Sequence, residues 1–533
     1  MIDHVLNMTH CPPSLEKEKQ QIGHAPDDGE TEKMKMASIG DEATTEPLLG
    51  REESGEVALR EPLARRKSYP HLNAKRVLIH LCILIALLDF SGYLILAPQT
   101  NIFENIICDK YYMGREEERD CKALAVQSEL AFIRGWKDAF AQLPAIVFGL
   151  PYGILADRIG RKPVLILFLI GFILSDTWIK VVCYFPAQFP LRLIWFSALI
   201  ECIGGGGQTF ASIAFTMVAD LFSGEDRFNA FLKVSATELI TQIVATPIAA
   251  LMMKRSPWLP LFLSSAINLI TYALCLRLAE TRPGRVEETS QSSFSPGWES
   301  DQQEQEDQKA ITRDSVKKFK SVLKSTKSLL WGNSSVVILL LVFFVACFGK
   351  ESLELLLQYI SKRYLWDYSQ ASLSITLQAS VSLGLNVLLL PGLDSYLRIQ
   401  RNMPAPTKDL RLSQGSCLLL FVGYLMIALS PHPGAMLAGV TLTALGSSFP
   451  LTLRSYATSF ISPSRVGTLY TGITVVMSAG LLISGPILYS LFRWGMSLDN
   501  FWLGLPYVFV SLLYFLAGVA IFSVGRLSKT QTW

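Results

Sequence analysis

Five carboxyl side chains in this sequence lie inside long apolar segments, where an ionised group has little water around it. They are Asp89, Glu201, Glu238, Glu351 and Glu354. A charged side chain at the centre of a bilayer costs about 2.5–3.5 kcal/mol or more unless it faces a water-filled cavity or a partner. Burial also favours the protonated form of a carboxyl group. These residues are therefore candidates for proton exchange or for contact with a substrate.

The same residues also allow a purely structural explanation. Asp89 could hold a neighbouring helix by hydrogen bonds. Glu351 and Glu354 share one helix face, and Lys350 can pair with Glu354 one turn further on. The residue types alone therefore leave proton exchange, substrate binding and structural ion pairing as alternatives.

The segments that carry these residues are predicted to be membrane-spanning helices. Of the 533 residues, 50% are hydrophobic and 17% are charged, whereas soluble proteins carry about 25% charged residues. The apolar residues gather in runs long enough to cross roughly 30 Å of hydrocarbon. The predicted spans are 77–97, 131–154, 163–184, 191–220, 230–253, 257–279, 335–359, 371–393, 411–430, 434–457, 465–490 and 501–525. The net charge of +3 gives no indication of nucleic-acid binding.

Polar segments divide the chain into a tail, two halves and a linker. Residues 1–75, rich in Glu, Asp, Lys, Ser and Pro, are predicted to form a disordered cytoplasmic tail. Six spans fall in 76–280 and six in 334–527, and the polar residues 281–333 form a predicted cytoplasmic linker between these halves. Residues 528–533 are the predicted cytoplasmic C-terminus.

Basic residues near the ends of the predicted helices indicate the orientation in the membrane, because cytoplasmic loops carry an excess of Lys and Arg. If both termini are cytoplasmic, the basic residues on the cytoplasmic side are Arg65, Arg66, Lys67, Lys75, Arg76, Arg158, Arg161, Lys162, Arg398, Arg401, Lys408 and Arg411. Lys254, Arg255, Lys362 and Arg363 fall on the opposite side. The larger group favours both termini in the cytoplasm. The membrane itself is expected to be the plasma membrane or the vacuolar membrane.

Two of the nine cysteines lie in the polar segment after the first predicted helix. Most of the others lie in apolar runs, where a thiol acts as a small hydrophobic group. If the polar segment faces outward or into an organelle lumen, Cys108 and Cys121 are predicted to form a disulfide. The alternative is a pair of free thiols.

A dense group of charges and glycines joins the second and third predicted helices, with the sequence GILADRIGRK. The first glycine of this string would allow close helix approach, and the second can take the positive φ of a tight turn. Charge in so short a turn is costly unless it is paired or lies at a membrane edge. The residues expected to act here are Gly153, Asp157, Arg158, Gly160, Arg161 and Lys162.

This string resembles the signature loop between helices 2 and 3 of the major facilitator superfamily. The resemblance implies an all-α integral membrane fold with twelve transmembrane helices in two six-helix pseudo-symmetric halves. It also implies a secondary active transporter that moves a small organic molecule by alternating access, with helices 1, 4 and 7 around the central cavity. Asp89, Glu201 and Glu354 lie on those three helices.

The resemblance further implies a gate at the cytoplasmic side. It places an acid at the inner end of helix 4, where Asp220 stands, and Asp157, Arg161 and Asp220 would then form a charge cluster that closes the inside. The positive N-terminal end of helix 11, which begins near residues 462–465, would attract Asp157.

A mirrored gate in the second half would join Asp394 to Arg454. The sequence also departs from the family pattern in helix 4. Many proton-coupled members carry an arginine four residues before a glycine pair, whereas here Glu201 stands four residues before Gly205. This departure puts the usual arginine-assisted proton mechanism in doubt for this chain.

Three longer strings resemble fungal members of the superfamily. They are YLILAPQTNIFENIIC, GKESLELLLQYISKRYLW and RSYATSFISPSRVGTLYTGI. Such members often occur near secondary-metabolite or nutrient pathways. Export of a secondary metabolite or xenobiotic is therefore favoured slightly over nutrient uptake, with protons as the candidate coupling ion.

The expected partners are the lipid bilayer and a small-molecule substrate, and the chain is expected to act as a monomer. The sequence contains no recognisable nucleotide loop, metal-ligand cluster or nucleophile motif. No cofactor, metal, nucleic-acid partner or enzymatic activity is therefore expected. A nutrient sensor that keeps the transporter fold and signals through its tail is a further alternative.

Overall fold

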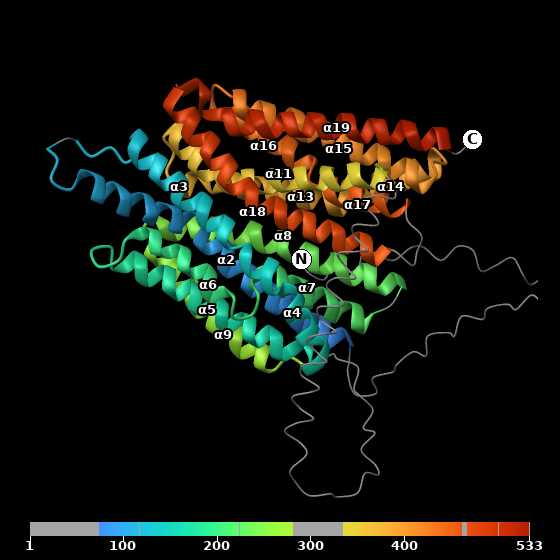
Figure 1. Ribbon diagram of the computed structural model, residues 1–533, viewed down its shortest axis with the longest axis horizontal. Helices are drawn as coiled ribbons and strands as arrows, with labels where there is room; N and C mark the ends of the chain where they lie inside the picture. The colour runs from blue at the N-terminus through green and yellow to red at the C-terminus, as the bar shows by residue number, and fades with distance from the viewer. Residues whose placement is uncertain are drawn as a thin grey trace, which may run out of the picture. The chain divides into compact units, whose positions relative to one another are not determined.

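The chain folds into long helices, and the described residues contain no strand (Figure 1). The structure is a computed structural model that describes residues 74–116, 118–222, 224–280, 334–460, 466–498 and 500–531. The helices of the first half are α2 (Ala74–Tyr112), α3 (Leu124–Phe140), α4 (Leu143–Ile159), α5 (Arg161–Tyr184), η1 (Leu191–Phe196), α6 (Ser197–Glu201), α7 (Gly206–Leu221), α8 (Gly224–Met253) and α9 (Trp258–Leu276). The helices of the second half are α11 (Ser334–Tyr364), α12 (Tyr368–Ala371), α13 (Leu373–Gly384), η2 (Leu385–Leu389), α14 (Leu390–Ser395), η3 (Tyr396–Gln400), α15 (Ala405–Leu429), α16 (Pro433–Leu445), α17 (Phe449–Thr458), α18 (Val466–Leu498), η5 (Asn500–Gly504) and α19 (Leu505–Gln531).

These helices belong to one unit, Lys67–Trp533. Residues 1–73 of the predicted tail and the whole predicted linker, 281–333, lie outside the described residues.

Most of the helical segments are long and apolar enough to cross a membrane. Within the described ranges ten qualify, or eleven if the bent pair α3–α4 is one span. One further segment, η1–α6–α7, is broken in the middle. It runs from Arg192, which binds Glu129, to Asp220, which binds Arg161. Since these partners lie at opposite ends of the bundle, the segment also runs the length of the bundle, where the sequence predicts the fourth span.

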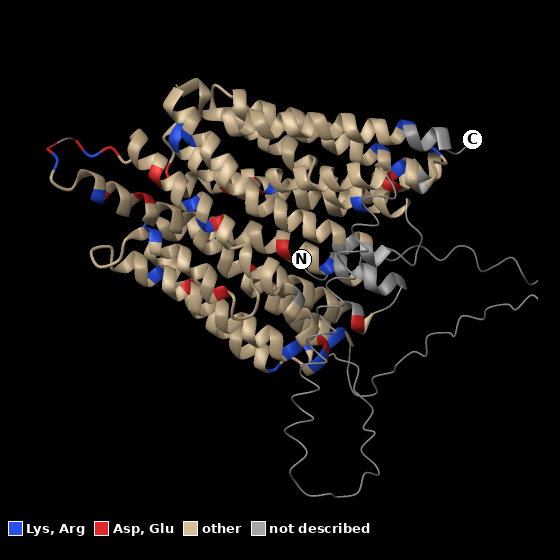
Figure 2. Ribbon diagram, viewed as in Figure 1, with Lys and Arg blue, Asp and Glu red and all other residues tan. Residues whose placement is uncertain are grey.

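Charged residues gather near the ends of the helices, and fewer lie between them (Figure 2). The end at which α2 begins and α19 stops is called the inner end below, and the opposite end the outer end. Long uncharged stretches between the two ends are what a helix needs to cross hydrocarbon. The few charges within them must therefore find partners inside the protein or face water.

The first helix is longer than its hydropathy predicts. α2 continues to Tyr112, beyond the predicted end at residue 97. The extra turns bury Ile102 and Phe103 against the outer part of α3 and its neighbours, so packing extends the helix past the apolar stretch. Cys108 consequently lies in α2. The sequence had predicted that it lies in the loop after this helix.

The break in the fourth passage is made by glycines. Gly204, Gly205 and Gly206 all have positive φ, at 113°, 81° and 74°. A side chain at Gly205 would place its Cβ 2.7 Å from the Tyr152 ring. Only glycine satisfies both the backbone and this close approach, so the break is fixed by the sequence.

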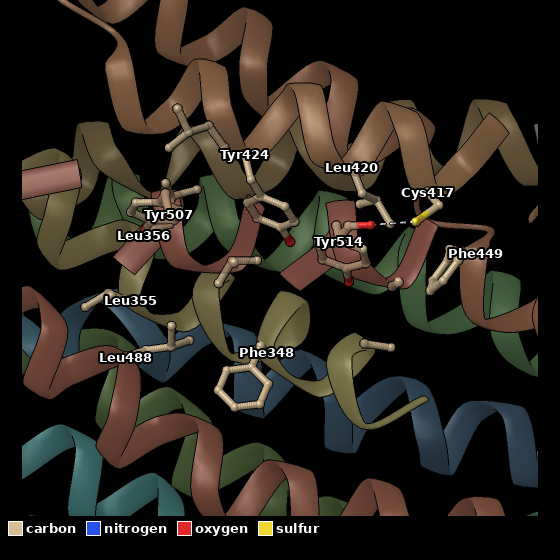
Figure 3. Close-up of a cluster of buried hydrophobic side chains, with 14 of the residues drawn as sticks. Phe348, Leu355, Leu356, Cys417, Leu420, Tyr424, Phe449, Leu488, Tyr507 and Tyr514 are labelled. Carbon is tan, nitrogen blue, oxygen red and sulfur yellow. Dashed lines mark hydrogen bonds between the residues drawn. The ribbon is translucent and has the colours of Figure 1, made fainter. Parts of the chain in front are cut away.

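The second half has a core that is built around tyrosines (Figure 3). The rings of Tyr424 and Tyr514 stack with centroids 5.5 Å apart. The hydroxyl of Tyr424 donates to the Gly349 carbonyl at 2.9 Å, and that of Tyr507 donates to the Ser352 carbonyl at 3.1 Å. These bonds tie α11 to α15 and α19, because a buried hydroxyl needs a partner. α11 is thereby held as a rigid part of the second half.

Candidate functional site

At the inner end of the first half, one guanidinium joins two carboxylates. Arg161 forms an ion pair with Asp157, and its Nε donates to Asp220 Oδ2 at 3.3 Å. All three residues belong to the first half, on α5, α4 and α7, so these two contacts join helices of that half. The expected attraction between Asp157 and the start of helix 11 concerns residues 462–465, which lie outside the described residues.

A further acid, Glu280 after α9, belongs to the same cluster and was not expected from the sequence. Its carboxylate accepts hydrogen bonds from the backbone N–H groups of Arg161 at 2.9 Å and Lys162 at 3.0 Å. The first amides of a helix have no partner within it, so Glu280 caps α5 and complements its positive end. Lys162 Nζ donates to the Leu276 carbonyl at 2.8 Å, and the neighbouring Arg158 is exposed.

The two glycines of this loop have different surroundings. Gly160 has φ 113°, and a Cβ there would lie 2.8 Å from Cδ of Glu280, so glycine is required on both counts. A Cβ added at Gly153 would have no atom within 4 Å. The close helix approach expected at Gly153 is therefore not present.

The second half has its own inner cluster, with a different pairing from the one expected. Asp394 pairs with Lys408 and not with Arg454. Lys408 Nζ also lies 3.5 Å from Asp409. Arg454 on α17 instead has its Nη2 3.9 Å from the sulfur of Met477. The short connection from η3 to α15 brings Lys408 beside Asp394, which sequence spacing alone did not reveal.

Two of the carboxyl groups at membrane depth lie on α2 and α8. Asp89 is half-buried and Glu238 is exposed. They lie within electrostatic range of each other, and Tyr93 lies within range of both. Neither acid has an ion-pair partner among the residues that the structure describes.

Glu201 faces a neighbouring helix of its own half. Its Oε1 accepts a hydrogen bond from Ser175 on α5 at 2.9 Å. The next residue on α5, Asp176, forms a buried ion pair with Lys180 at 2.5 Å, and Lys180 Nζ donates to Ser264 on α9 at 3.1 Å. These contacts stay within the first half and indicate a packing role for Glu201.

Charged and polar groups also lie where α3 meets α11 and α18 of the other half. Arg134 on α3 is buried and lies 3.8 Å from the Glu354 carboxylate, and its Nη2 donates to the Glu354 carbonyl at 3.2 Å. The Tyr489 hydroxyl on α18 donates to Asp138 at 3.4 Å. Glu354 therefore has Arg134, and not Lys350, as its ion-pair partner.

Glu351, on the same face of α11 as Glu354, has a different environment. It is 5% exposed, whereas the side chain of Glu354 is 42% exposed. Its Oε1 has no hydrogen-bond partner within the described part of the chain. The two acids thus differ in their burial, although they lie only three residues apart.

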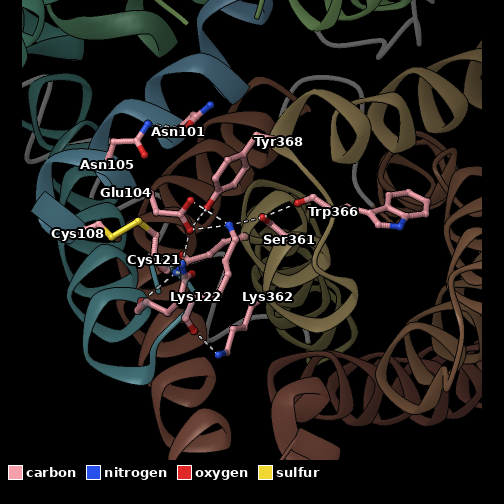
Figure 4. A network of polar contacts seen from close by, with 12 residues as sticks. Asn101, Glu104, Asn105, Cys108, Cys121, Lys122, Ser361, Lys362, Trp366 and Tyr368 are labelled. Atoms are coloured by element: carbon pink, nitrogen blue, oxygen red, sulfur yellow. Dashed lines mark hydrogen bonds and ion pairs between the residues drawn. A yellow bond between two sulfur atoms is a disulfide. The ribbon is translucent and has the colours of Figure 1, made fainter. Parts of the chain in front are cut away.

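At the outer end, Lys122 joins the two halves (Figure 4). Its ammonium binds both carboxylate oxygens of Glu104 on α2, at 2.7 and 2.9 Å, and donates to the Ser361 hydroxyl on α11 at 2.6 Å. Lys362 on α11 donates to the Lys122 carbonyl. The Tyr368 hydroxyl on α12 donates to Glu104 at 3.2 Å. One buried carboxylate and one ammonium therefore connect the first half to α11 and α12.

A pair of glutamines extends this connection. Gln358 on α11 donates from Nε2 to the Gln127 carbonyl on α3 at 2.9 Å and to its side-chain oxygen at 3.1 Å. Gln127 in turn donates to Glu104. We call this network the outer clasp; it consists of Glu104, Lys122, Gln127, Gln358, Ser361, Lys362 and Tyr368. Both glutamines are fully buried, so this part of the clasp closes the outer contact between the halves with neutral groups, beside the ion pair of Lys122 and Glu104.

A disulfide supports the outer clasp from one side. Cys108 near the end of α2 is bonded to Cys121, the residue before Lys122. Gln127 Nε2 donates to the Cys121 carbonyl at 2.9 Å. The disulfide therefore fixes the backbone that presents Lys122 to α11 (Figure 4).

The outer clasp was not predicted from the sequence. Glu104 lies beyond the predicted end of the first helix, and its partners are spread over both halves. Arg134 offered a clearer signal, since it is a base within a predicted span and such a charge needs a partner.

These groups are suited to binding and to exchanging contacts rather than to breaking covalent bonds. The outer clasp joins the halves, whereas each inner cluster described above joins helices of one half. Within the described ranges, no group of three or more His, Cys, Asp or Glu is placed to hold a metal ion. Two helical halves with ionisable groups at their contact, embedded in a bilayer, define a multi-pass membrane transporter.

The chain belongs to the Major Facilitator Superfamily, whose family model matches residues 75–405. It is 33% identical to the efflux pump ustT of Aspergillus flavus, over 82% of this chain and 86% of that protein. It is 32% identical to the MFS efflux pump atnC of Emericella nidulans, over 84% of this chain and 88% of that protein. The MFS-type transporter avaK of Aspergillus versicolor is 31% identical, over 84% of this chain and 92% of that protein. The predicted resemblance to fungal members is confirmed.

Solved structures share the fold at low sequence identity. The human organic anion transporter MFSD10 superposes with a TM-score of 0.54 at 17% identity, over 84% of this chain and all of that chain. A D-xylose–proton symporter superposes with a TM-score of 0.57 at 14% identity, over 83% of this chain and 96% of that chain. These likenesses confirm the all-α major facilitator fold.

Proposed function

We propose that this protein exports a small organic molecule from the cytoplasm by alternating access, driven by protons moving the opposite way. The similarity to two fungal proteins named efflux pumps, at 33% and 32% identity over most of both chains, carries this proposal. Both termini and the segment 281–333 would lie in the cytoplasm, with the inner end of the bundle facing it. The protein would act as a monomer in the plasma membrane or the vacuolar membrane.

The outer clasp supports a conformation that is closed to the outside. Opening outward would separate Lys122 from Ser361 and Gln358 from Gln127, because these pairs belong to different halves. The inner clusters need not break, since their partners move together within one half. Asp89, Glu201, Glu238 and Glu354 are carboxyl groups at membrane depth that are not buried, and they could contact the substrate or exchange protons on this path.

The export proposal is tested by comparing metabolites in cells and medium, with and without the protein. An Arg134→Gln variant, which removes the buried partner of Glu354, is expected to lose export. Arg192→Gln changes an exposed arginine whose partner Glu129 lies in the same half, so export should persist. The expected result is a compound that accumulates in the medium with the wild type and the Arg192 variant but stays inside with the Arg134 variant.

A compound that the wild type removes from the medium would contradict export and establish uptake. If the inserted wild-type protein changes no metabolite on either side, transport itself is contradicted. The remaining role would then be a sensor that signals through its tail.

A further inference from the structure

Glu351 is a buried acid at the contact between the two halves for which the contacts described above provide no partner. It lies on α11, which is fixed in the second half by the tyrosine core. A Cβ built on Gly485 of α18 would lie 3.2 Å from Oε1 of Glu351 and 3.2 Å from the carbonyl oxygen of Gly135 on α3. The carboxyl group thus lies where three helices from both halves meet.

The charged groups around Glu351 lie within electrostatic range of it, but within the described part of the chain none of them forms an ion pair with it. Asp138 and Arg134 approach from α3, Glu354 and Lys350 from α11, and Tyr489 from α18. Arg134 is engaged with Glu354, and Tyr489 donates to Asp138. Lys350 is exposed, and no base among the described residues lies within ion-pair distance of Glu351. The two nearby acids add repulsion to any negative charge on it.

An ionised Glu351 would therefore be a buried charge without a counter-ion, at a cost of several kcal/mol. A protonated Glu351 avoids this cost, because a neutral carboxyl group is far less costly to bury than a carboxylate. When the halves separate at the outer end, water reaches the carboxyl group and the ionised form is no longer penalised. The protonation of this one side chain is thus linked to closure of the contact.

We propose that Glu351 is the proton carrier of this transporter: it must bind a proton for the outer end to close, and its deprotonation favours outward opening. This proposal rests on the proposed proton-driven export. In the outward-open state the carboxylate takes a proton from outside water, and a new O–H bond forms. After closure that bond breaks, and the proton passes to the carboxylate of Glu354 and then to water on the inner side.

The distance between the outer ends of the two halves, measured at several pH values, tests this proposal without a substrate. Spin labels are attached through an unnatural amino acid at positions 113 and 498, whose native side chains are 82% and 49% exposed. For the wild type in lipid nanodiscs, the ratio of long to short distances should rise with pH, by up to about tenfold per unit for one linked proton. Glu351→Gln, a neutral side chain of the same shape, should keep the short distance at every pH.

Glu129→Gln provides the matched control. This glutamate lies on the outer part of α3 and pairs with Arg192 in the same half, so its variant should keep the full pH response. If Glu351→Gln does not fold, Glu351→Met replaces it with a neutral side chain of similar size and carries the same expectation.

A wild-type pH response that persists in the Glu351 variants would overturn the proposal, as would its loss in Glu129→Gln. Because the measurement contains no substrate, its result is independent of export. A failed export test with a lost pH response in Glu351→Gln would contradict the direction of transport and leave the proton switch in place.

Discussion

The two ends of the helical bundle are held together in different ways. At the outer end, Lys122 and Gln358 each contact residues of the opposite half. At the inner end, Arg161 and Lys408 pair with acids of their own half. Contacts across the halves must break when an end opens, whereas contacts within a half move with it. Among the described contacts, those of the outer clasp join the two halves, whereas those of the charge-rich inner loop join helices of one half.

Of the variants described here, removal of Lys122 should weaken the outer contact between the two halves the most. In Lys122→Ala, the carboxylate of Glu104 loses its counter-ion, although its side chain is only 6% exposed. Breaking a buried pair by removing one partner costs about 3–5 kcal/mol. We expect a lower thermal unfolding temperature in detergent and a larger separation of the outer ends.

Arg192→Ala is the matched control for Lys122→Ala. It also removes a base at the outer end, but the pair of Arg192 with Glu129 is exposed and lies within one half. Such pairs contribute about 0–1 kcal/mol. An equal loss of stability in both variants would contradict the assignment of the clasp.

The disulfide should have the next largest effect. Cys108 and Cys121 close a loop with a sequence separation of 13, for which chain entropy predicts a stabilisation of about 3 kcal/mol. Replacement of both by Ser should lower the unfolding temperature and weaken the hold of Lys122 on α11. Cys202→Ser, at a free cysteine, should change neither property. Reductant should lower the wild-type unfolding temperature and leave the double variant unchanged, and any other pattern would show that the bridge does not support the clasp.

Loss of Arg161 tests whether the inner cluster also holds the two halves together. Arg161→Ala removes the charged hydrogen bonds to Asp157 and Asp220, and each such bond contributes about 1.5–3 kcal/mol at most. We expect reduced stability and reduced transport, but an unchanged distance between the inner ends. An increase in that inner distance would mean that the inner cluster also holds the halves together.

The glycine pair of the inner loop should give the smallest effects. Gly160→Ala forces a side chain into a positive φ and toward Glu280, a strain of about 1–3 kcal/mol. Gly153→Ala meets open space and should stay within about 0.5 kcal/mol of the wild type. Unfolding temperatures of the two variants measure the difference, and equal values would contradict the local geometry.

The sequence was sufficient for the features that depend on local pattern. The family loop and the apolar runs predicted the fold, and Gly160 was identified because a positive φ favours one residue type. The predicted end of the first helix was wrong because the apolar stretch stops before the helix does. The prediction of a close helix approach at Gly153 was wrong because the position of another helix cannot be deduced from the residues around one glycine.

Pairings between distant segments could not be predicted. Gln127 and Gln358 are 231 residues apart, and each is an ordinary polar residue in its own segment. Asp394 was matched with Arg454 by analogy with the first half, whereas the turn after η3 places Lys408 nearer. Both cases depend on tertiary geometry, which residue types and spacing do not determine.

The central claim is that the outer clasp opposes opening of the outer end, and a pair of distances tests it most directly. Spin labels at positions 113 and 498 report on the outer ends, and labels at positions 159 and 399 report on the inner ends. These four side chains are exposed. In Lys122→Ala the outer distance should lengthen and the inner distance should shorten relative to the wild type. If both distances stay unchanged, or both lengthen together, the clasp does not control alternating access.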